Sequence, residues 1–292
     1  MTDIQLWTAL ITPMKEDGSI HFKNLDEIIS RQEEAGNGIL VLGSTGEGLA
    51  LAHNEKKEIV DFISDRGNSV PIMVGVGGFN LKTQTDWISY CNEKNIESFL
   101  LVNPLYSKPG LKGQFEWFKS LMDVSDKPCM IYNIPSRTGV KLFPEVLQQL
   151  KHHGNLWAVK EASGSISEFQ EFRKAVPSIP LFSGDDGLMP FFATAGGSGL
   201  VSVASNIWPK ETKLYVEKSL KGDTASLFPI WTDAVKALFS ASNPIPLKVL
   251  MKEKGLIERS VLRSPLTNEE LSSTDHLRAS DEAIINWYQL NK

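Results

Sequence analysis

The residue of this 292-residue chain most suited to chemistry is Lys160, which directly follows the apolar run LWAV. Alternation of side chains along a strand places Lys160 on the same side as Ala158 and opposite Trp157. A lysine that points into an apolar interior loses hydration, which lowers its pKa and frees the neutral amine that attacks a ketone. The alternative is a lysine without a catalytic role that extends from the strand end into solvent. The sequence therefore indicates either an imine-forming lysine or a solvated one.

A second candidate segment is GSTGE at Gly43–Glu47, which follows an apolar run and precedes a helical pattern through Glu55 and Ile59. Glycines and hydroxyl residues at a helix N-terminus offer free backbone N–H groups to a carboxylate. Ser44 and Glu47 also have the spacing of a capping box, so the segment could do no more than start a helix. Both interpretations expect the helix to begin here.

Two tyrosines and an arginine follow other apolar runs. Tyr132 and Arg137 lie in YNIPSRTG, where the phenol could move protons and the guanidinium could hold a carboxylate bidentately. Tyr106 lies in NPLYSKPG after an earlier run. The alternatives are a core tyrosine, a solvated arginine and a loop aromatic that covers an interface.

Other kinds of site are not indicated. The five histidines show no metal-ligand spacing, and no GxSxG segment marks a hydrolase nucleophile. GVGGFN at Gly75–Asn80 only half resembles a dinucleotide loop, and AGGSG at Ala195–Gly199 precedes its apolar run instead of following it. We expect neither a metal nor a cofactor.

Composition excludes several partners. A net charge of −5 without a Lys/Arg stripe argues against nucleic acid, and no apolar stretch approaches the length of a membrane span. Cys91 and Cys129 form no CxxC motif, and no secretion signal precedes Trp7. These features predict two reduced thiols in a cytoplasmic protein.

The elements that must position these residues are eight short apolar runs alternating with longer segments of helical period. The runs are residues 4–13, 38–43, 70–77, 98–104, 128–135, 156–162, 179–186 and 199–206. Almost wholly apolar strands imply burial on both faces, and eight of them predict an α/β fold, the (β/α)8 TIM barrel. A doubly wound sheet is the rival, but TPMKEDGS follows the first run instead of GxGxxG. We expect a catalytic barrel over residues 1–222 and a C-terminal helical extension over residues 223–292.

Seven motifs occur in order along the chain: GSTGE, LYSKPG, YNIPSRTG, VKEASG, SGDD, SVASN and NPIPLK. Together they resemble the dihydrodipicolinate synthase family, within the wider group of pyruvate-dependent class I aldolases that includes N-acetylneuraminate lyase. The resemblance covers essentially the whole chain. It implies condensation of pyruvate with L-aspartate 4-semialdehyde in diaminopimelate and lysine biosynthesis, by a homotetramer built as a dimer of dimers.

The resemblance also implies a role for each matching residue. Lys160 would form the imine with pyruvate. The proton relay would consist of Tyr132, Ser44 and Tyr106, with Tyr106 reaching the neighbouring subunit's site. The remaining substrate contacts would come from the Ser44 and Thr45 amides, the Arg137 guanidinium and backbone groups at Gly184 and Val201.

Departures from the family pattern keep alternatives open. Ser44 stands where the synthases commonly have threonine and the neuraminate lyases have serine, whereas Arg137 and NPIPLK favour a synthase. A neuraminate lyase or 2-keto-3-deoxy sugar-acid aldolase is the second hypothesis, and a non-catalytic keto-acid-binding barrel is the third.

The effector region departs as well. Members of the family that lysine inhibits typically carry histidine, glutamate and an aromatic residue where this chain has Lys56, Gln84 and Leu105, while His53 and Asn80 match. We therefore expect weak feedback inhibition by lysine.

Overall fold

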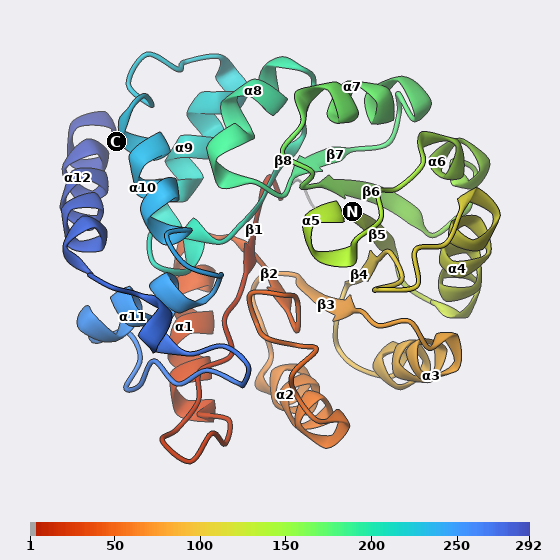
Figure 1. The fold of residues 1–292 in the computed structure, drawn as a ribbon, viewed down its shortest axis with the longest axis horizontal. Helices are drawn as coiled ribbons and strands as arrows, with labels where there is room; N and C mark the ends of the chain where they lie inside the picture. The colour runs from red at the N-terminus through yellow and green to blue at the C-terminus, as the bar shows by residue number, and fades with distance from the viewer. Residues whose placement is uncertain (1–3) are drawn as a thin grey trace.

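The computed structural model describes residues 4–292, which form a closed barrel of eight parallel strands (Figure 1). The strands are β1 (Leu6–Ala9), β2 (Gly38–Val41), β3 (Ile72–Val76), β4 (Ser98–Val102), β5 (Cys129–Asn133), β6 (Leu156–Glu161), β7 (Leu181–Ser183) and β8 (Gly199–Ser202). Each strand pairs with the next, and β8 pairs with β1. The predicted (β/α)8 barrel is confirmed, and each expected apolar run contains one strand.

Helices follow the strands and surround the barrel (Figure 1). They are α1 (Phe22–Ala35), α2 (His53–Arg66), α3 (Leu81–Asn92), α4 (Leu111–Val124), α5 (Pro135–Thr138), α6 (Pro144–Leu150), α7 (Ile166–Ala175), α8 (Met189–Thr194) and α9 (Pro209–Lys221). Short 3-10 turns lie at η1 (Asp186–Leu188) and η2 (Ala204–Asn206). In α1 the buried residues Leu25, Ile28 and Ile29 recur at helical spacing, which turns one apolar face toward the strands.

The apolar core has two layers, one inside the barrel and one between the strands and the surrounding helices. The interior layer consists of Trp7, Ala9, Leu40, Met73, Leu100, Met130, Tyr132, Ala158, Phe182 and Val201. The larger layer lies between strands and helices. Trp7 fills part of the interior so closely that a Cβ at Gly38 would lie 2.6 Å from its ring. The interior is therefore packed, as in other barrels of this type, and not an open pore.

Trp157 does not lie where simple alternation predicts. The pairing of β5 with β6 skips this residue, because Cys129 pairs with Leu156 and Met130 with Ala158. Trp157 packs with the interior layer, with its ring centroid 5.8 Å from those of Trp7 and Phe182. The expectation that it points outward was wrong, since a bulge adds one residue to a strand and breaks the two-residue period.

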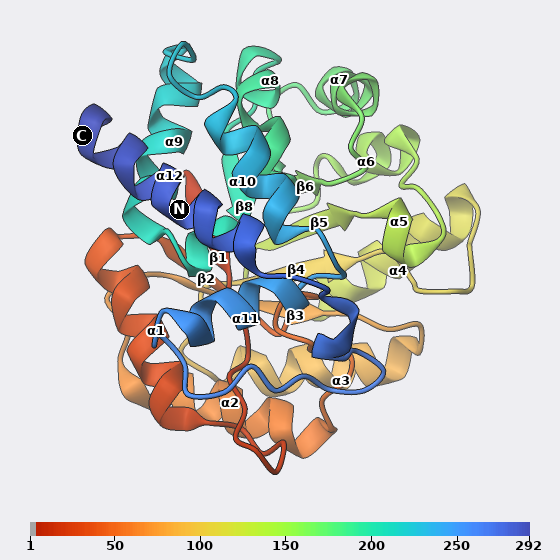
Figure 2. The ribbon, with the colours of Figure 1, turned by 60° about the vertical axis from the view of Figure 1, so that its left-hand side comes forward.

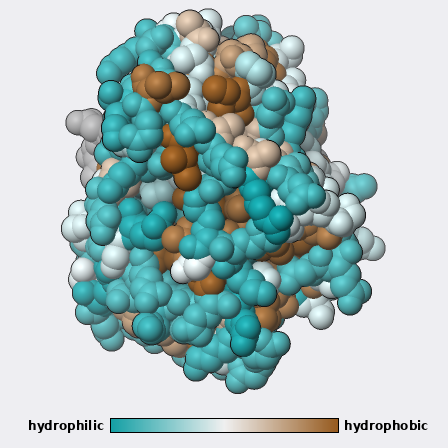
Figure 3. Space-filling view, turned by 90° about the vertical axis from the view of Figure 1, so that its left-hand side faces the viewer, coloured by the Kyte–Doolittle hydropathy of each residue, from teal (hydrophilic) through white to brown (hydrophobic). Residues whose placement is uncertain are grey.

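Three further helices follow the barrel and cover one side of it (Figure 2): α10 (Ile230–Leu238), α11 (Ile245–Glu253) and α12 (Asp275–Asn291), with a 3-10 turn η3 (Asn268–Glu270). Trp231 of α10 stacks on Tyr215 of α9 with centroids 4.1 Å apart and meets Trp287 of α12 edge-on at 5.4 Å. The outer face of these helices is mainly hydrophilic, with separate apolar spots (Figure 3). We propose that residues 223–292 are an extension of the 1–222 barrel, whose first three residues lie outside the described part.

The two cysteines are free, as predicted, and both are buried. Burial raises the pKa of each thiol to about 12, so both stay protonated near neutral pH. Within residues 4–292, no helix combines the length and the apolar character needed to cross a membrane.

Candidate active site

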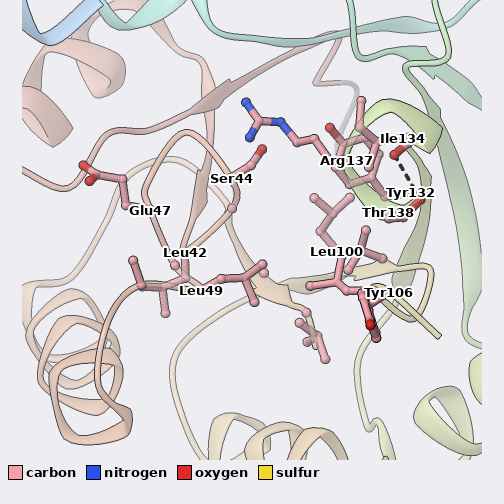
Figure 4. Close-up of a pocket in the computed structure, with 18 of the residues that line it drawn as sticks. Leu42, Ser44, Glu47, Leu49, Leu100, Tyr106, Tyr132, Ile134, Arg137 and Thr138 are labelled. Atoms are coloured by element: carbon pink, nitrogen blue, oxygen red, sulfur yellow. Dashed lines mark hydrogen bonds between the residues drawn. The ribbon is translucent and has the colours of Figure 1, made fainter. Parts of the chain in front are cut away.

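A cavity of about 750 Å³ lies at the carboxyl ends of the strands, where barrels of this kind carry their active sites. Residues at or just after the ends of β2, β4 and β5 line it, including Ser44, Tyr106, Tyr132 and Arg137 (Figure 4). The extension contributes Asn243 and residues 263–266. The cavity therefore joins segments from both parts of the chain.

Lys160 lies at the end of β6 and is buried, with 5% of its surface exposed. Its Nζ atom lies 4.2 Å from the centroid of the Tyr132 ring. Loss of hydration lowers the pKa of Lys160 to about 7, an effect that Asp186 opposes and Arg137 reinforces. The side chain is not solvated, and much of it is the neutral amine near pH 7.

Tyr132 lines the cavity and is in contact with Lys160 through its ring. Burial raises its pKa to about 12, while the positive charge of Arg137 and a hydrogen bond with Ser44 act in the opposite direction. Figure 4 shows the Arg137 guanidinium extended toward Ser44 beside the Tyr132 ring. Because Tyr132 keeps its proton at neutral pH, it can donate that proton and exchange it through Ser44.

Gly43–Glu47 does not open a helix, so both expectations for a helix start at this segment were wrong. Helix α2 begins at His53, where the Ala52 backbone N–H donates to Glu55 Oε2 at 2.8 Å. The chain doubles back after β2, and a Cβ at Gly48 would lie 2.1 Å from the Leu42 carbonyl oxygen. Glu47 is buried and pairs with Lys248 instead of capping a helix.

Four of the predicted site residues do not line the cavity itself. Thr45, Lys160, Gly184 and Val201 are not among the described residues that line the cavity. Gly184 adjoins the lysine, since a Cβ there would lie 2.6 Å from Lys160 Cε. Thr45 is buried, and its Oγ1 accepts a hydrogen bond from Asn243 Nδ2 at 3.0 Å.

Tyr106 lies on the rim of the cavity and is 87% exposed. Its backbone is left-handed with φ of 64°, which is uncommon for a residue with a Cβ. The backbone N–H of Tyr106 donates to the Thr138 carbonyl at 3.3 Å. This contact ties the Tyr106 loop to the segment that carries Arg137.

Asp186 and Asn243 are polar residues of the site to which the sequence analysis assigned no role. Asp186 lies in the SGDD motif and Asn243 in the NPIPLK motif. Asp186 is buried, which raises its pKa to about 6, and it accepts hydrogen bonds from Ser202 Oγ and the Val203 N–H. Asn243 donates to Thr45 and accepts from Arg137 Nη2 at 3.3 Å. Their contacts are made between residues that are not neighbours in the chain, so the motifs were the only sign of these two residues in the sequence.

Metal ligands do not gather in the described part of the chain, where no group of three or more His, Cys, Asp or Glu side chains could hold an ion. The reactive groups described above at this site are the Lys160 amine, the hydroxyls of Tyr132 and Ser44, and the Arg137 guanidinium.

A (β/α)8 barrel with a dehydrated lysine at the end of β6, next to a tyrosine and a serine, defines the class of Schiff-base-forming lyases. The model of the dihydrodipicolinate synthetase family matches residues 4–284. The chain belongs to this family.

Relatives and solved structures agree with this membership. The 4-hydroxy-tetrahydrodipicolinate synthase of Francisella tularensis subsp. novicida is 46% identical over 97% of both chains. The crystal structure of dihydrodipicolinate synthase from Aquifex aeolicus has a TM-score of 0.89 at 31% identity and covers 99% of each chain. That of the Acinetobacter baumannii enzyme complexed with pyruvate has a TM-score of 0.88 at 26% identity, covering 98% of this chain and 99% of that one.

The low pKa of Lys160 predicts a pH profile. Attack on a ketone needs the neutral amine, so the rate of adduct formation at low pyruvate should rise about tenfold per pH unit in acid and level off above a pH of about 7. The measurement is kcat/KM for pyruvate from about pH 5 to about pH 9. A continued rise to the alkaline end would show a lysine with an ordinary pKa.

Gly184→Ala should disturb Lys160 directly. The new Cβ would lie 2.6 Å from Lys160 Cε and 2.7 Å from Ala162 Cβ, so the lysine must move. We expect kcat/KM to fall at least about tenfold and the free energy of unfolding to fall by about 1–3 kcal/mol. Gly154→Ala is the matched control, because no atom lies within 4 Å of its Cβ position. Stability is measured by urea unfolding and kinetics on the folded protein, and unchanged kinetics of a folded Gly184→Ala sample would contradict the prediction.

Proposed function

We propose that this chain is a 4-hydroxy-tetrahydrodipicolinate synthase, which condenses pyruvate with L-aspartate 4-semialdehyde in diaminopimelate and lysine biosynthesis. The observation that carries the proposal is the burial of Lys160 against the Tyr132 ring, with its pKa lowered to about 7. The names of the relatives support the same activity. The reaction needs no cofactor, because the lysine itself activates the ketone.

The first half of the reaction activates pyruvate. The neutral Lys160 amine attacks the keto carbon, and the resulting carbinolamine loses water to form the imine. Tyr132 and Ser44 supply the proton that leaves with the hydroxyl group and later accept one from the methyl carbon, giving an enamine. The Ser44 and Thr45 amides are proposed to hold the pyruvate carboxylate.

The second half joins the two substrates. The enamine carbon attacks the aldehyde carbon of the semialdehyde, whose oxygen takes a proton from the relay. The amino group of the semialdehyde then displaces Lys160 from the imine carbon, which closes the ring and restores the free lysine. Arg137 is proposed to hold the carboxylate of the semialdehyde, since its guanidinium lines the cavity next to Ser44.

Assembly is a further part of the proposal. Tyr106, 87% exposed, and Leu49, 58% exposed, line the same cavity. Phe79, 66% exposed, follows Gly78, whose carbonyl accepts from the N–H of Leu105 at 3.2 Å. An apolar rim of this kind favours contact with a second copy of the chain, where Tyr106 would complete the partner's relay. We propose a homotetramer, formed as a dimer of dimers, in the cytoplasm.

The imine can be trapped. Incubation with pyruvate and borohydride should add the mass of reduced pyruvate to the wild-type chain and none to Lys160→Ala, because the amine that forms the bond is gone. Intact mass spectrometry is the measurement. Absence of an adduct from the wild type would remove the enzymatic mechanism and favour a keto-acid-binding barrel.

The second substrate separates the two enzymatic hypotheses in the same preparation. Consumption of the semialdehyde with pyruvate identifies the synthase. Cleavage of N-acetylneuraminate or a 2-keto-3-deoxy sugar acid, without activity on the semialdehyde, would identify the sugar-acid lyase instead.

Feedback inhibition by lysine should be weak. His53, Lys56, Gln84 and Leu105 line the outer part of the cavity, and burial lowers the pKa of Lys56. A site that already disfavours one ammonium group disfavours a second cation beside it. We expect an inhibition constant for L-lysine above about a millimolar. The double variant Lys56→His/Gln84→Glu tests whether these two residues weaken the inhibition, and L-lysine should inhibit it more strongly than the wild type. Stronger inhibition of the wild type than of this variant would contradict the account.

A further inference from the structure

Lys248 is a charged side chain buried completely in the protein, away from Lys160. Its Nζ lies 2.5 Å from Glu47 Oε1 and donates to the Val261 carbonyl at 2.8 Å. The exposed fractions of the two side chains are 0% for Lys248 and 2% for Glu47. Removing one member of such a pair leaves an unpaired charge in the interior, which is strongly destabilising.

Glu47 occupies a backbone conformation that needs support. Its φ of 54° and that of Leu42, 59°, are left-handed, a conformation that is strained for residues with a Cβ. Such strain persists only where surrounding contacts hold it. The loop from Leu42 to Glu47 must therefore be held from outside.

The contacts that hold this loop come mainly from the extension. Glu47 Oε2 accepts from the Arg263 N–H at 2.7 Å, in addition to the ion pair with Lys248. The Asn243 amide donates to Thr45 Oγ1 at 3.0 Å. From the barrel, Thr12 Oγ1 donates to the Gly46 carbonyl at 2.7 Å.

The supported loop carries the part of the relay that meets Tyr132. Ser44 lies three residues before Glu47, lines the cavity together with Tyr132, and its hydroxyl lowers the pKa of Tyr132. Figure 4 shows Ser44 directed toward Arg137 and the Glu47 carboxylate directed away from both. Although Glu47 is one of the residues that line the cavity, both of its carboxylate oxygens are engaged, by Lys248 and by the Arg263 N–H, so it acts on the position of the loop.

We propose that Lys248 is a positioning residue of the active site, which acts through Glu47 to hold the Gly43–Glu47 loop so that Ser44 meets Tyr132. This inference rests on the proposed function. On this proposal the extension helps to position the catalytic residues, because α11 contains Lys248 and the segment before α11 contains Asn243.

The test compares Lys248→Met, the double variant Glu47→Gln/Lys248→Met and Lys254→Met. Lys254 directly follows α11 and pairs with Asp281 at 2.5 Å, within the extension, so it controls for loss of a partly buried lysine. Each is measured for thermal stability, for kcat and KM with pyruvate, and for the rate of borohydride-trapped adduct formation.

We expect Lys248→Met to lose about 100-fold in kcat/KM for pyruvate and to form the trapped adduct correspondingly slowly, since a small misplacement of a catalytic group has effects of this size. The double variant should recover thermal stability, because no unpaired charge remains. It should still lose at least about tenfold in kcat/KM, because the loop lacks its anchor. Lys254→Met should stay within about threefold of the wild type.

Three outcomes would overturn the inference: a folded Lys248→Met or double variant within about threefold of the wild type, a double variant whose activity returns together with its stability, or an equal loss in Lys254→Met. If Lys248→Met does not fold, the double variant decides. The wild-type adduct is the separate check on the proposed function, so an active wild type with active Lys248 variants removes only the positioning role.

Discussion

Lys160 loses its hydration because the barrel closes around it. The proposed chemistry depends on this loss, because a hydrated lysine is an ammonium group near neutral pH and cannot attack the keto carbon. The change in pKa from 10.5 to about 7 corresponds to about 5 kcal/mol of lost preference for the ammonium form. An apolar interior packed with Trp7, Phe182 and Val201 imposes this cost. Asp186 limits the effect, since its charge favours the protonated amine.

The same closure raises the pKa of Tyr132, so one environment prepares both partners of a proton exchange. The lysine is left with a free electron pair near neutral pH, and the phenol is left with its proton. Arg137 adjusts both groups from the cavity side, lowering the pKa of each. An exposed lysine, with a pKa of about 10.4, is an ammonium group near neutral pH, and at the alkaline pH where it becomes neutral an exposed tyrosine, with a pKa of about 10, has lost its own proton.

The extension supports the site from the other side. Lys248, Asn243 and the backbone of Arg263 all contact the loop after β2, which joins residues about 200 positions apart in the chain. A boundary at residue 222 describes the order of elements along the chain, whereas the contacts cross it. The barrel provides the lysine, and the proposed geometry of the serine depends on the helices that follow.

Predictability from the sequence differed between features for physical reasons. The eight strands were predictable because strands covered by helices on the outside and packed inside must be apolar throughout, and Lys160 was conspicuous because it ends such a run. Trp157 was misplaced because a bulge leaves no mark in a pattern of alternation. The helix expected at Gly43–Glu47 was wrong because capping-box residue types also suit a tight turn, and Glu47 found a buried partner in Lys248.

Local patterns and motifs thus determined the fold class, the family and the positions of the reactive side chains, because each depends on neighbours in the chain or on short recurring segments. Tertiary structure alone decided which residues lie at the cavity surface, how far the pKa of Lys160 falls and which distant side chains hold the Ser44 loop. Those properties depend on burial and on contacts such as Glu47 with Lys248, and sequence separation carries no information about either.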